Sequence, residues 1–296
     1  MELFGGVGVA LITPMNEKGI DYAETEKLLE HTLSGGADAL FALGTTGEPS
    51  TLTAAERTGF LQFVLKTVRG RVPVFAGTGS NNTADAVEKS VAAERLGADG
   101  LLVVTPYYNK CTQNGLYEHY KKIDEAVGIP IVVYNVPPRT RVNIEPATAV
   151  RLAGLKNVRA LKEANGEIDH MLDMMAAVKD TGLTVYSGDD SLTSVAMSLG
   201  AKGVISVAAN IVPAEMKKLT DLCAAGDYAA AAAQQLRLLP FLRALFCEVN
   251  PIPAKKAAEF IGIRAGKPRL PLTEMEPAHA ERLRRTLIDL GVIGGA

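Results

Sequence analysis

The sequence predicts an α/β protein whose parallel strands close into a (β/α)8 TIM barrel, followed by a helical C-terminal extension. Three observations support this prediction. Eight short apolar runs alternate with amphipathic segments over about the first two thirds of the 296 residues, which is typical of βα units around a parallel sheet. A Gly-Ala step recurs before three of these runs. The last third of the chain shows only helical patterns.

The predicted strands are short and apolar on both faces, as expected for a sheet that is covered by helices. In chain order they are Val7–Ile12, Ala39–Leu43, Val72–Ala76, Gly100–Val104, Pro130–Tyr134, Val158–Lys162, Leu183–Ser187 and Gly203–Val207. Helical patterns lie between them, most clearly over Tyr22–Leu33, Ala54–Val68, Thr83–Leu96 and Gly115–Ala126.

Three similar segments stand just before a strand or at its start: Gly36-Ala37-Asp38, Gly97-Ala98-Asp99 and Gly200-Ala201-Lys202. Each places a glycine after a helical segment, where glycine readily adopts the left-handed conformation that ends a helix. The recurrence favours repeated units that close into a barrel over an open sheet. Independent use of the same turn chemistry would give the same pattern.

The C-terminal part is too long to be only the eighth barrel helix. Its helical patterns cover Ala214–Ala225, Asp227–Glu248, Ala254–Ile261 and Pro277–Leu290. We therefore expect a catalytic barrel over residues 1–225 and a helical extension over residues 226–296. Because no low-complexity linker separates the two parts, we expect the extension to pack on the barrel.

Composition excludes several classes of protein. With 31 basic and 33 acidic residues, the chain lacks the positive field that nucleic-acid binding requires. No apolar run approaches the ~20 residues of a membrane span, and the start, Met1–Phe4, lacks the basic region of a secretory signal. The cysteines are odd in number and far apart, which indicates a reducing compartment. We expect a cytoplasmic protein without nucleic-acid or membrane partners.

The carboxyl ends of the strands hold the active site in a barrel of this kind, and Lys162 ends the sixth strand. Alternation along that strand puts Val158, Ala160 and Lys162 on one face, which we expect to be the interior. Burial lowers the pKa of an ammonium group, toward about 7–8 in catalytic lysines, and so makes it a nucleophile for carbonyls. The alternative is a lysine that reaches the rim or pairs with Glu163.

Hydroxyl groups gather on the same rim. Tyr134 ends the neighbouring strand, and at a strand spacing of ~4.8 Å its phenol can reach Lys162 and shuttle protons. The alternative is a buried core tyrosine. Thr45 and Thr46 lie between two glycines and can bind a carboxylate, although ordinary turn chemistry also explains them.

Arg139 follows Pro137 and Pro138, which stiffen its loop. A fixed guanidinium suits bidentate capture of a substrate carboxylate. Arg141 is an equally good candidate by composition, and a surface charge is the alternative for either residue.

Metal and phosphate motifs are weak. The four histidines have no metal-ligand spacing and are expected on the surface: His31, His119, His170 and His279. Gly188-Asp189-Asp190 is interpreted as a helix cap rather than a metal site. No phosphate-binding glycine loop occurs.

Several segments together resemble the 4-hydroxy-tetrahydrodipicolinate synthase family, also called dihydrodipicolinate synthases, within the pyruvate-dependent class I aldolases. They run in family order over essentially the whole chain: Gly44-Thr45-Thr46-Gly47-Glu48, Pro106-Tyr107-Tyr108-Asn109, Tyr134-Asn135-Val136-Pro137-x-Arg139-Thr140, Lys162-Glu163-Ala164, Ser187-Gly188-Asp189-Asp190, Gly203-Val204-Ile205-Ser206-Val207, Asn250-Pro251-Ile252-Pro253 and Arg269-Leu270-Pro271-Leu272.

The resemblance implies that Lys162 forms a Schiff base with pyruvate and that Tyr134, Thr45 and Tyr108 form a proton relay. Tyr108 would reach into the site of a neighbouring subunit. Such a reaction needs no metal or organic cofactor, because the protonated imine itself makes the pyruvate methyl group acidic.

The resemblance further implies pyruvate-binding positions at Thr46, Gly188 and Ile205. Arg139 would bind the carboxylate of L-aspartate 4-semialdehyde, whose aldehyde the enamine attacks. The expected activity is the first committed step of lysine and diaminopimelate synthesis, in a homotetramer built from two tight dimers.

The sequence departs from the family pattern at two places. Arg141 stands where the family usually has glycine. The candidate lysine-inhibition pocket has Asp85 as a shortened acid, and Ala54 and Arg57 stand where inhibited members often have histidine or another ring. We therefore expect weak or absent inhibition by lysine. The candidate pocket residues are Asn81, Asp85 and Tyr107.

Two other functions are weighed against the synthase. One is a related lyase or aldolase, such as N-acetylneuraminate lyase or a 2-keto-3-deoxy acid aldolase; Arg139 and the complete set of Thr45, Tyr108 and Tyr134 argue against it. The other is a non-catalytic small-molecule-binding barrel, and the intact Lys162 argues against that.

Overall fold

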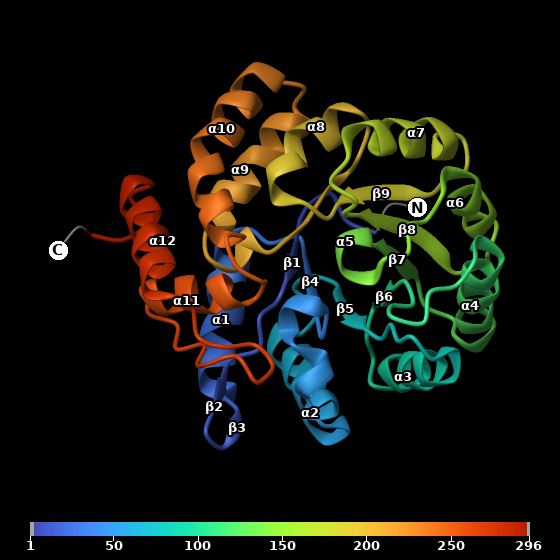
Figure 1. Ribbon diagram of the computed structural model, residues 1–296, viewed down its shortest axis with the longest axis horizontal. Coiled ribbons are helices and arrows are strands. Elements are labelled where there is room, and N and C mark those ends of the chain that lie inside the picture. Colours follow the sequence, from blue (N-terminus) through green and yellow to red (C-terminus); the bar gives the residue numbers. More distant parts are fainter. Residues whose placement is uncertain (1–2, 295–296) are drawn as a thin grey trace.

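Eight parallel strands close into a barrel in the computed structural model, which describes residues 3–294 (Figure 1). Met1 and Glu2 belong to the segment that lacks the basic region of a secretory signal, and they lie outside the described residues. The last strand pairs with the first, so the predicted TIM barrel is confirmed. The barrel strands are β1 Gly6–Ala10, β4 Ala39–Ala42, β5 Val74–Gly77, β6 Gly100–Val104, β7 Ile131–Asn135, β8 Val158–Glu163, β9 Thr184–Ser187 and β10 Gly203–Ser206.

Helices surround the barrel and connect its strands (Figure 1). Side-chain caps begin several of them, including the reciprocal bonds between Thr53 and Glu56 at the start of α2, an arrangement that satisfies two backbone donors. The helices are α1 Tyr22–Ser34, α2 Ala54–Val68, α3 Thr83–Arg95, α4 Gln113–Ala126, α5 Pro137–Thr140, α6 Pro146–Ala153, α7 Ile168–Val178, α8 Thr193–Ser198 and α9 Pro213–Ala224.

The three Gly-Ala steps have the same backbone geometry. Gly36, Gly97 and Gly200 all have positive φ, at 87°, 93° and 107°. The following alanine N–H in each case donates to a carbonyl five residues back, in the last turn of the preceding helix. These are the bonds of a left-handed helix end that only glycine adopts without strain, so the predicted role of the glycines is confirmed.

A short antiparallel hairpin, β2 Met15–Asn16 with β3 Gly19–Ile20, follows the first barrel strand. Sequence analysis missed it because strands of two residues show no alternation. It packs near the extension, since the Met15 N–H donates to the Ala265 carbonyl.

The extension comprises α10 Tyr228–Leu245, α11 Ile252–Phe260 and α12 Pro277–Asp289. Figure 1 shows these helices on one side of the barrel, with α12 outermost. α10 packs against α9 and α12. The division of the chain after Ala225 stays a prediction.

Aromatic side chains fill the amino-terminal end of the barrel. Phe4 stacks on Tyr186 at 4.2 Å between ring centroids, and Phe41 stacks on Phe75 at 4.7 Å. Gly8 leaves room for this cluster, because a Cβ there would lie 2.6 Å from the Phe41 ring. Aromatic rings therefore occupy this end of the barrel, and the candidate site lies at the opposite end.

In the part of the chain that the structure describes, no helix combines the length and the apolarity that crossing a membrane would require.

Candidate active site

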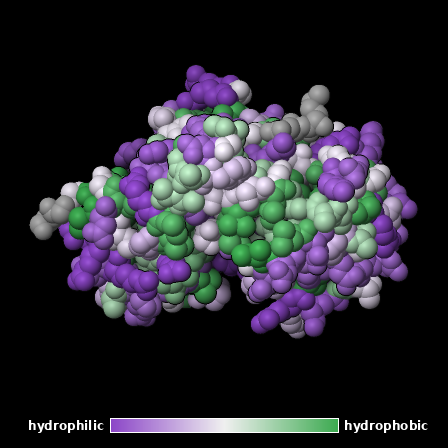
Figure 2. Space-filling model, turned by 90° about the horizontal axis from the view of Figure 1, so that it is seen from above, coloured by the Kyte–Doolittle hydropathy of each residue, from purple (hydrophilic) through white to green (hydrophobic). Residues whose placement is uncertain are grey.

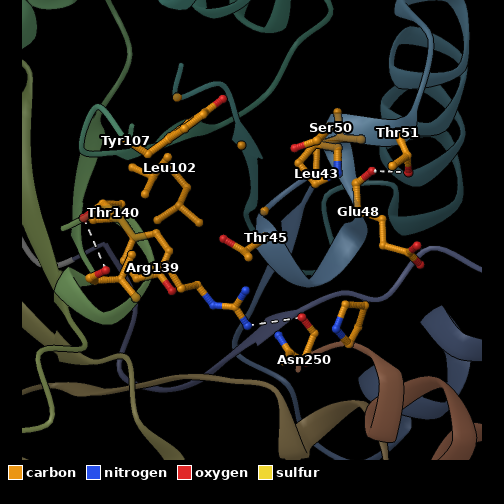
Figure 3. Close-up of a pocket in the computed structure, with 18 of the residues that line it drawn as sticks. Leu43, Thr45, Glu48, Ser50, Thr51, Leu102, Tyr107, Arg139, Thr140 and Asn250 are labelled. Atoms are coloured by element: carbon orange, nitrogen blue, oxygen red, sulfur yellow. Dashed lines mark hydrogen bonds between the residues drawn. The ribbon is translucent and has the colours of Figure 1, made fainter. Parts of the chain in front are cut away.

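Two adjoining cavities of about 320 and 520 Å³ lie at the carboxyl ends of the strands. Lys162 and Gly188 line the smaller cavity, and Tyr107 lines the larger one. Figure 3 shows Arg139 and Thr45 pointing into the space between the loops. Both cavities share the lining residues Gly44, Thr45, Leu102, Tyr134, Val136, Arg139 and Asn250.

Lys162 lies inside the barrel with only 4% of its surface exposed. Val158 and Ala160, which share its face of β8, are buried as well, whereas Arg159 is exposed. Burial lowers the pKa of Lys162 from 10.5 to about 8, against the opposing attraction of the Asp190 carboxylate. A substantial fraction of the amine is therefore neutral near physiological pH, as a nucleophile requires.

Tyr134 is the direct neighbour of Lys162 across the β7–β8 ladder. The Lys162 Nζ lies 4.3 Å from the centroid of the Tyr134 ring. Burial raises the pKa of Tyr134 to about 12, although the Arg139 charge and a hydrogen bond with Thr45 act in the opposite direction. The phenol thus keeps its proton in the free site and is placed to donate it.

Thr45 and Thr46 lie in a tight helical turn, Thr45–Gly47, that follows β4. Thr46 is buried, and its hydroxyl accepts a 2.9 Å hydrogen bond from Asn250 Nδ2. Glu48 ends the turn in a left-handed conformation and forms a buried ion pair with Lys255 of α11. The extension therefore holds the turn that carries the two threonines.

Arg139 lies in α5, the short helix that Pro137 begins directly after β7. Its Nη2 donates to the Asn250 carbonyl at 3.1 Å (Figure 3). Arg141 lines neither cavity and has a φ of 61°. Left-handed backbone disfavours side chains with a Cβ, which explains why a glycine would be the easier residue at this position.

The other predicted substrate positions differ in their placement. A Cβ on Gly188 would lie 3.0 Å from Lys162 Cε, so a glycine leaves room for the lysine chain. Ile205 is buried in β10 but lines neither cavity. Tyr108 has a φ of 70°, is 92% exposed and lines neither cavity.

The candidate inhibitor residues are only partly brought together. Tyr107 lines the larger cavity, whereas Asn81 and Asp85 do not. Asp85 forms a 2.6 Å ion pair with Lys89, and the Asn81 carbonyl accepts a hydrogen bond from Asn109.

Sequence reasoning missed the importance of Asn250. This buried residue holds both Thr46 and Arg139 from the loop between α10 and α11. The only indication in the sequence that Asn250 matters for the site was its place in the family segment Asn250-Pro251.

The predicted cap at residues 188–190 is present: Asp189 accepts hydrogen bonds from the backbone and hydroxyl of Ser191. Asp190 instead is buried and accepts from the N–H groups of Val207 and Ala208 after β10. Burial raises the pKa of Asp190 to about 6.

The expected surface position of the histidines is wrong for His119. Its ring is buried in α4, where Nδ1 lies 3.0 Å from the Thr83 hydroxyl, and burial lowers its pKa to about 4. Leu116, Tyr120 and Ile123 flank it at helical spacing, and that apolar face was the signal for its burial. Among residues 3–294, no group of histidine, cysteine or acidic side chains could hold a metal ion.

Comparison with known proteins adds to this geometry. A family model described as the dihydrodipicolinate synthetase family matches residues 3–290. A 4-hydroxy-tetrahydrodipicolinate synthase of Caldicellulosiruptor bescii is 48% identical over 293 residues, which cover 99% of each chain.

Solved structures agree. Dihydrodipicolinate synthase from Thermotoga maritima superimposes with a TM-score of 0.97 at 41% identity, covering 99% of this chain and 100% of that one. The chloride-inhibited dihydrodipicolinate synthase from Acinetobacter baumannii, complexed with pyruvate, gives a TM-score of 0.95 at 42% identity, with coverage of 99% and 100%.

Proposed function

The chain belongs to the dihydrodipicolinate synthetase family, and we propose that Lys162 carries out its reaction by forming a Schiff base with pyruvate. Its activity is that of a 4-hydroxy-tetrahydrodipicolinate synthase, a lyase of lysine and diaminopimelate biosynthesis. The observation that carries the proposal is the burial of the Lys162 amine against Tyr134 in a cavity that also holds a guanidinium.

The first stage is imine formation. The neutral Nζ of Lys162 attacks the ketone carbon of pyruvate, and the resulting carbinolamine loses water to give a protonated imine. Tyr134 donates a proton to the departing hydroxyl and regains a proton through Thr45. Thr46 and the backbone near Gly188 bind the pyruvate carboxylate, with Ile205 supporting the wall of the site from within β10.

The second stage forms the carbon–carbon bond. Loss of a methyl proton to the relay of Tyr134 and Thr45 converts the imine to an enamine. The enamine carbon attacks the aldehyde carbon of L-aspartate 4-semialdehyde, and the relay returns a proton to the aldehyde oxygen. Arg139 holds the carboxylate of that substrate. The substrate amine then displaces Lys162 from the imine carbon, which closes the ring and frees the lysine. No metal or organic cofactor takes part in these steps.

We also propose that the protein is a homotetramer of two tight dimers in which Tyr108 completes the relay in a neighbouring subunit. The 92% exposure of a tyrosine ring supports this proposal, since aromatic side chains are enriched in interfaces. Figure 2 views the side on which α7, α8 and α10 lie in Figure 1 and displays apolar areas among hydrophilic ones. Exposed apolar side chains of these helices include Ile168, Leu172, Val195 and Leu236.

A cytoplasmic location is proposed because Cys111, Cys223 and Cys247 are free thiols, and disulfides are rare in reducing compartments. Lysine is proposed to inhibit weakly or not at all, because Asp85 is already paired with Lys89. A titration that showed strong inhibition at submillimolar lysine would contradict this.

The test of the function is a coupled enzymatic assay that follows product formation from pyruvate and L-aspartate 4-semialdehyde. We expect turnover with this aldehyde and none with N-acetylmannosamine or a sugar-derived aldehyde. Turnover only with the sugar aldehydes would assign the chain to the related lyases, and no turnover with any aldehyde would indicate a binding protein.

A further inference from the structure

A buried polar cluster backs the catalytic pair on the outer side of the barrel wall. Tyr134 and Lys162 are neighbours across the β7–β8 ladder, and the next pair along the same ladder is Asn135 with Glu163. Because successive side chains point to opposite faces of a strand, this second pair lies directly behind the first. Asn135 has no exposed surface and Glu163 has 1%.

Both oxygens of Glu163 have partners. Asn135 Nδ2 lies 3.0 and 2.9 Å from its two carboxylate oxygens, and the Asn165 N–H donates to Oε1 at 2.7 Å. On the other side, His170 Nε2 lies 3.4 Å from Oε2, an ion-pair distance. His170 is the only cationic partner that Glu163 has in an ion pair within residues 3–294.

The cluster also holds the loop that follows Arg139. Asn135 Nδ2 donates to Asn143 Oδ1 at 2.8 Å, and Asn135 Oδ1 accepts from the Ile144 N–H at 3.0 Å. A single side chain thus links the end of β7, the end of β8 and the return of the Arg139 loop. The backbone bond from the Ala164 N–H to the Asn135 carbonyl, at 2.9 Å, closes this end of the ladder, and the Asn135 and Glu163 side chains add to it.

We infer that Glu163 is a positioning residue that keeps Lys162 and Tyr134 in reacting geometry, and that His170 is the cation that holds Glu163 in place. The inference rests on the proposed Schiff-base function of Lys162. Glu163 does not line either cavity, so it acts on the catalytic pair from behind and not on the substrate. Its negative charge also contributes to the raised pKa of Tyr134.

His170 makes this support dependent on pH. The Glu163 carboxylate raises the pKa of His170 above its ordinary value of 6.5, against burial, and Asp173 of the same helix adds to the effect. The neutral Asn143 amide lies 3.5 Å from its other ring nitrogen. As pH rises through the pKa of His170, the ring loses its charge. Nδ1 then becomes an acceptor for Asn143 Nδ2, and the Nε2–H still faces Glu163, but the buried carboxylate no longer has a cationic partner.

Two substitutions test the inference. Glu163→Gln keeps the shape of the side chain but replaces one carboxylate oxygen by an NH2 group. That group then faces the N–H donors of Asn135 or Asn165 and cannot accept their hydrogen bonds. We expect kcat to fall about tenfold or more, because small misplacements of reacting groups are costly. The KM for pyruvate should change little, since Glu163 does not contact the cavity. The matched control is Glu167→Gln, the same substitution at an exposed residue nearby, which should leave kcat unchanged.

His170→Gln is the second variant, which tests the inference should Glu163→Gln fail to fold. It removes the titrating group from a side chain that is 14% exposed and keeps a hydrogen-bond donor there. We expect the ratio of wild-type kcat to His170→Gln kcat to fall as pH rises above about 6.5. Trapping with borohydride and pyruvate should still label Lys162 in both variants.

The outcomes separate the two proposals. If wild-type protein forms no adduct at Lys162, the Schiff-base function and this inference both fail. If wild-type protein forms the adduct but Glu163→Gln has wild-type kcat, or the kcat ratio for His170→Gln is flat with pH, the positioning role is wrong and the function stands.

Discussion

The Lys162 amine lies over the face of the Tyr134 ring, 4.3 Å from its centroid. The register of β7 and β8 sets this relationship, because the two residues are direct partners in the ladder. The amine is buried deeply enough for its pKa to fall to about 8. The ring and the amine together form the centre of the proposed site, and the following predictions start from them.

Imine formation should depend on pH through Lys162. Its neutral form is the nucleophile, and with a pKa of about 8 about a tenth of it is neutral at pH 7, against less than about a thousandth for an ordinary lysine. The initial rate of borohydride-trappable adduct should therefore rise with pH and level off above about pH 8. A rate that still rises tenfold per pH unit up to pH ~10 would show that the pKa of Lys162 is not lowered.

Arg139→Lys should impair binding of the aldehyde substrate alone. Lysine keeps the charge but cannot make the paired hydrogen bonds of a guanidinium. A lost charged hydrogen bond of about 1.5–3 kcal/mol raises KM for L-aspartate 4-semialdehyde about tenfold or more. Adduct formation with pyruvate should be unchanged.

Arg141→Lys is the matched control, since Arg141 lies in the same loop but lines neither cavity. Equal effects of the two substitutions on KM would contradict the assigned role of Arg139.

Tyr108 should act in a neighbouring subunit. Lys162→Ala and Tyr108→Phe are each expected to have low activity. Co-refolding the two variants should restore part of it, because a mixed oligomer contains a site with both Lys162 and a donated Tyr108. Mixing Lys162→Ala with Tyr134→Phe should restore nothing if those two residues serve the same site. Mixed oligomers, verified by native mass spectrometry, that regain no activity would refute this arrangement.

Lys255→Met should destabilise the fold. The side chains of Lys255 and Glu48 are 1% and 2% exposed, and removal of one partner leaves a buried charge at a cost of about 3–5 kcal/mol. Lys256→Met is the control, because Lys256 pairs with Glu259 on the surface, where an ion pair contributes about 0–1 kcal/mol. Urea unfolding of both variants measures the difference, and equal losses would contradict the account.

Much of this barrel could be predicted from local patterns. β6 agrees to the residue with the prediction, and the other barrel strands agree within two residues at each end. A Gly-Ala turn before Gly100 and the apolar run after it define that strand without help from distant residues. The Lys162–Tyr134 pair followed from alternation and strand order, which are also local.

The parts that escaped prediction depend on contacts between distant segments. Asn250 meets Thr46 across 204 residues of chain, and Lys255 meets Glu48 across 207. Neither pairing leaves a pattern in either segment. From the sequence, Glu163 was expected only as an alternative partner of Lys162. The burial of Glu163 against His170 could not be predicted, because His170 lies on a helix whose rotation the sequence does not specify.

The central claim is that Lys162 forms a covalent imine with pyruvate. The most direct measurement is the intact mass of the protein after borohydride reduction in the presence of pyruvate, followed by peptide mapping. The account predicts one reduced pyruvyl adduct per chain, on Lys162, and none in Lys162→Ala. An unmodified mass, or an adduct on any other lysine, would contradict it.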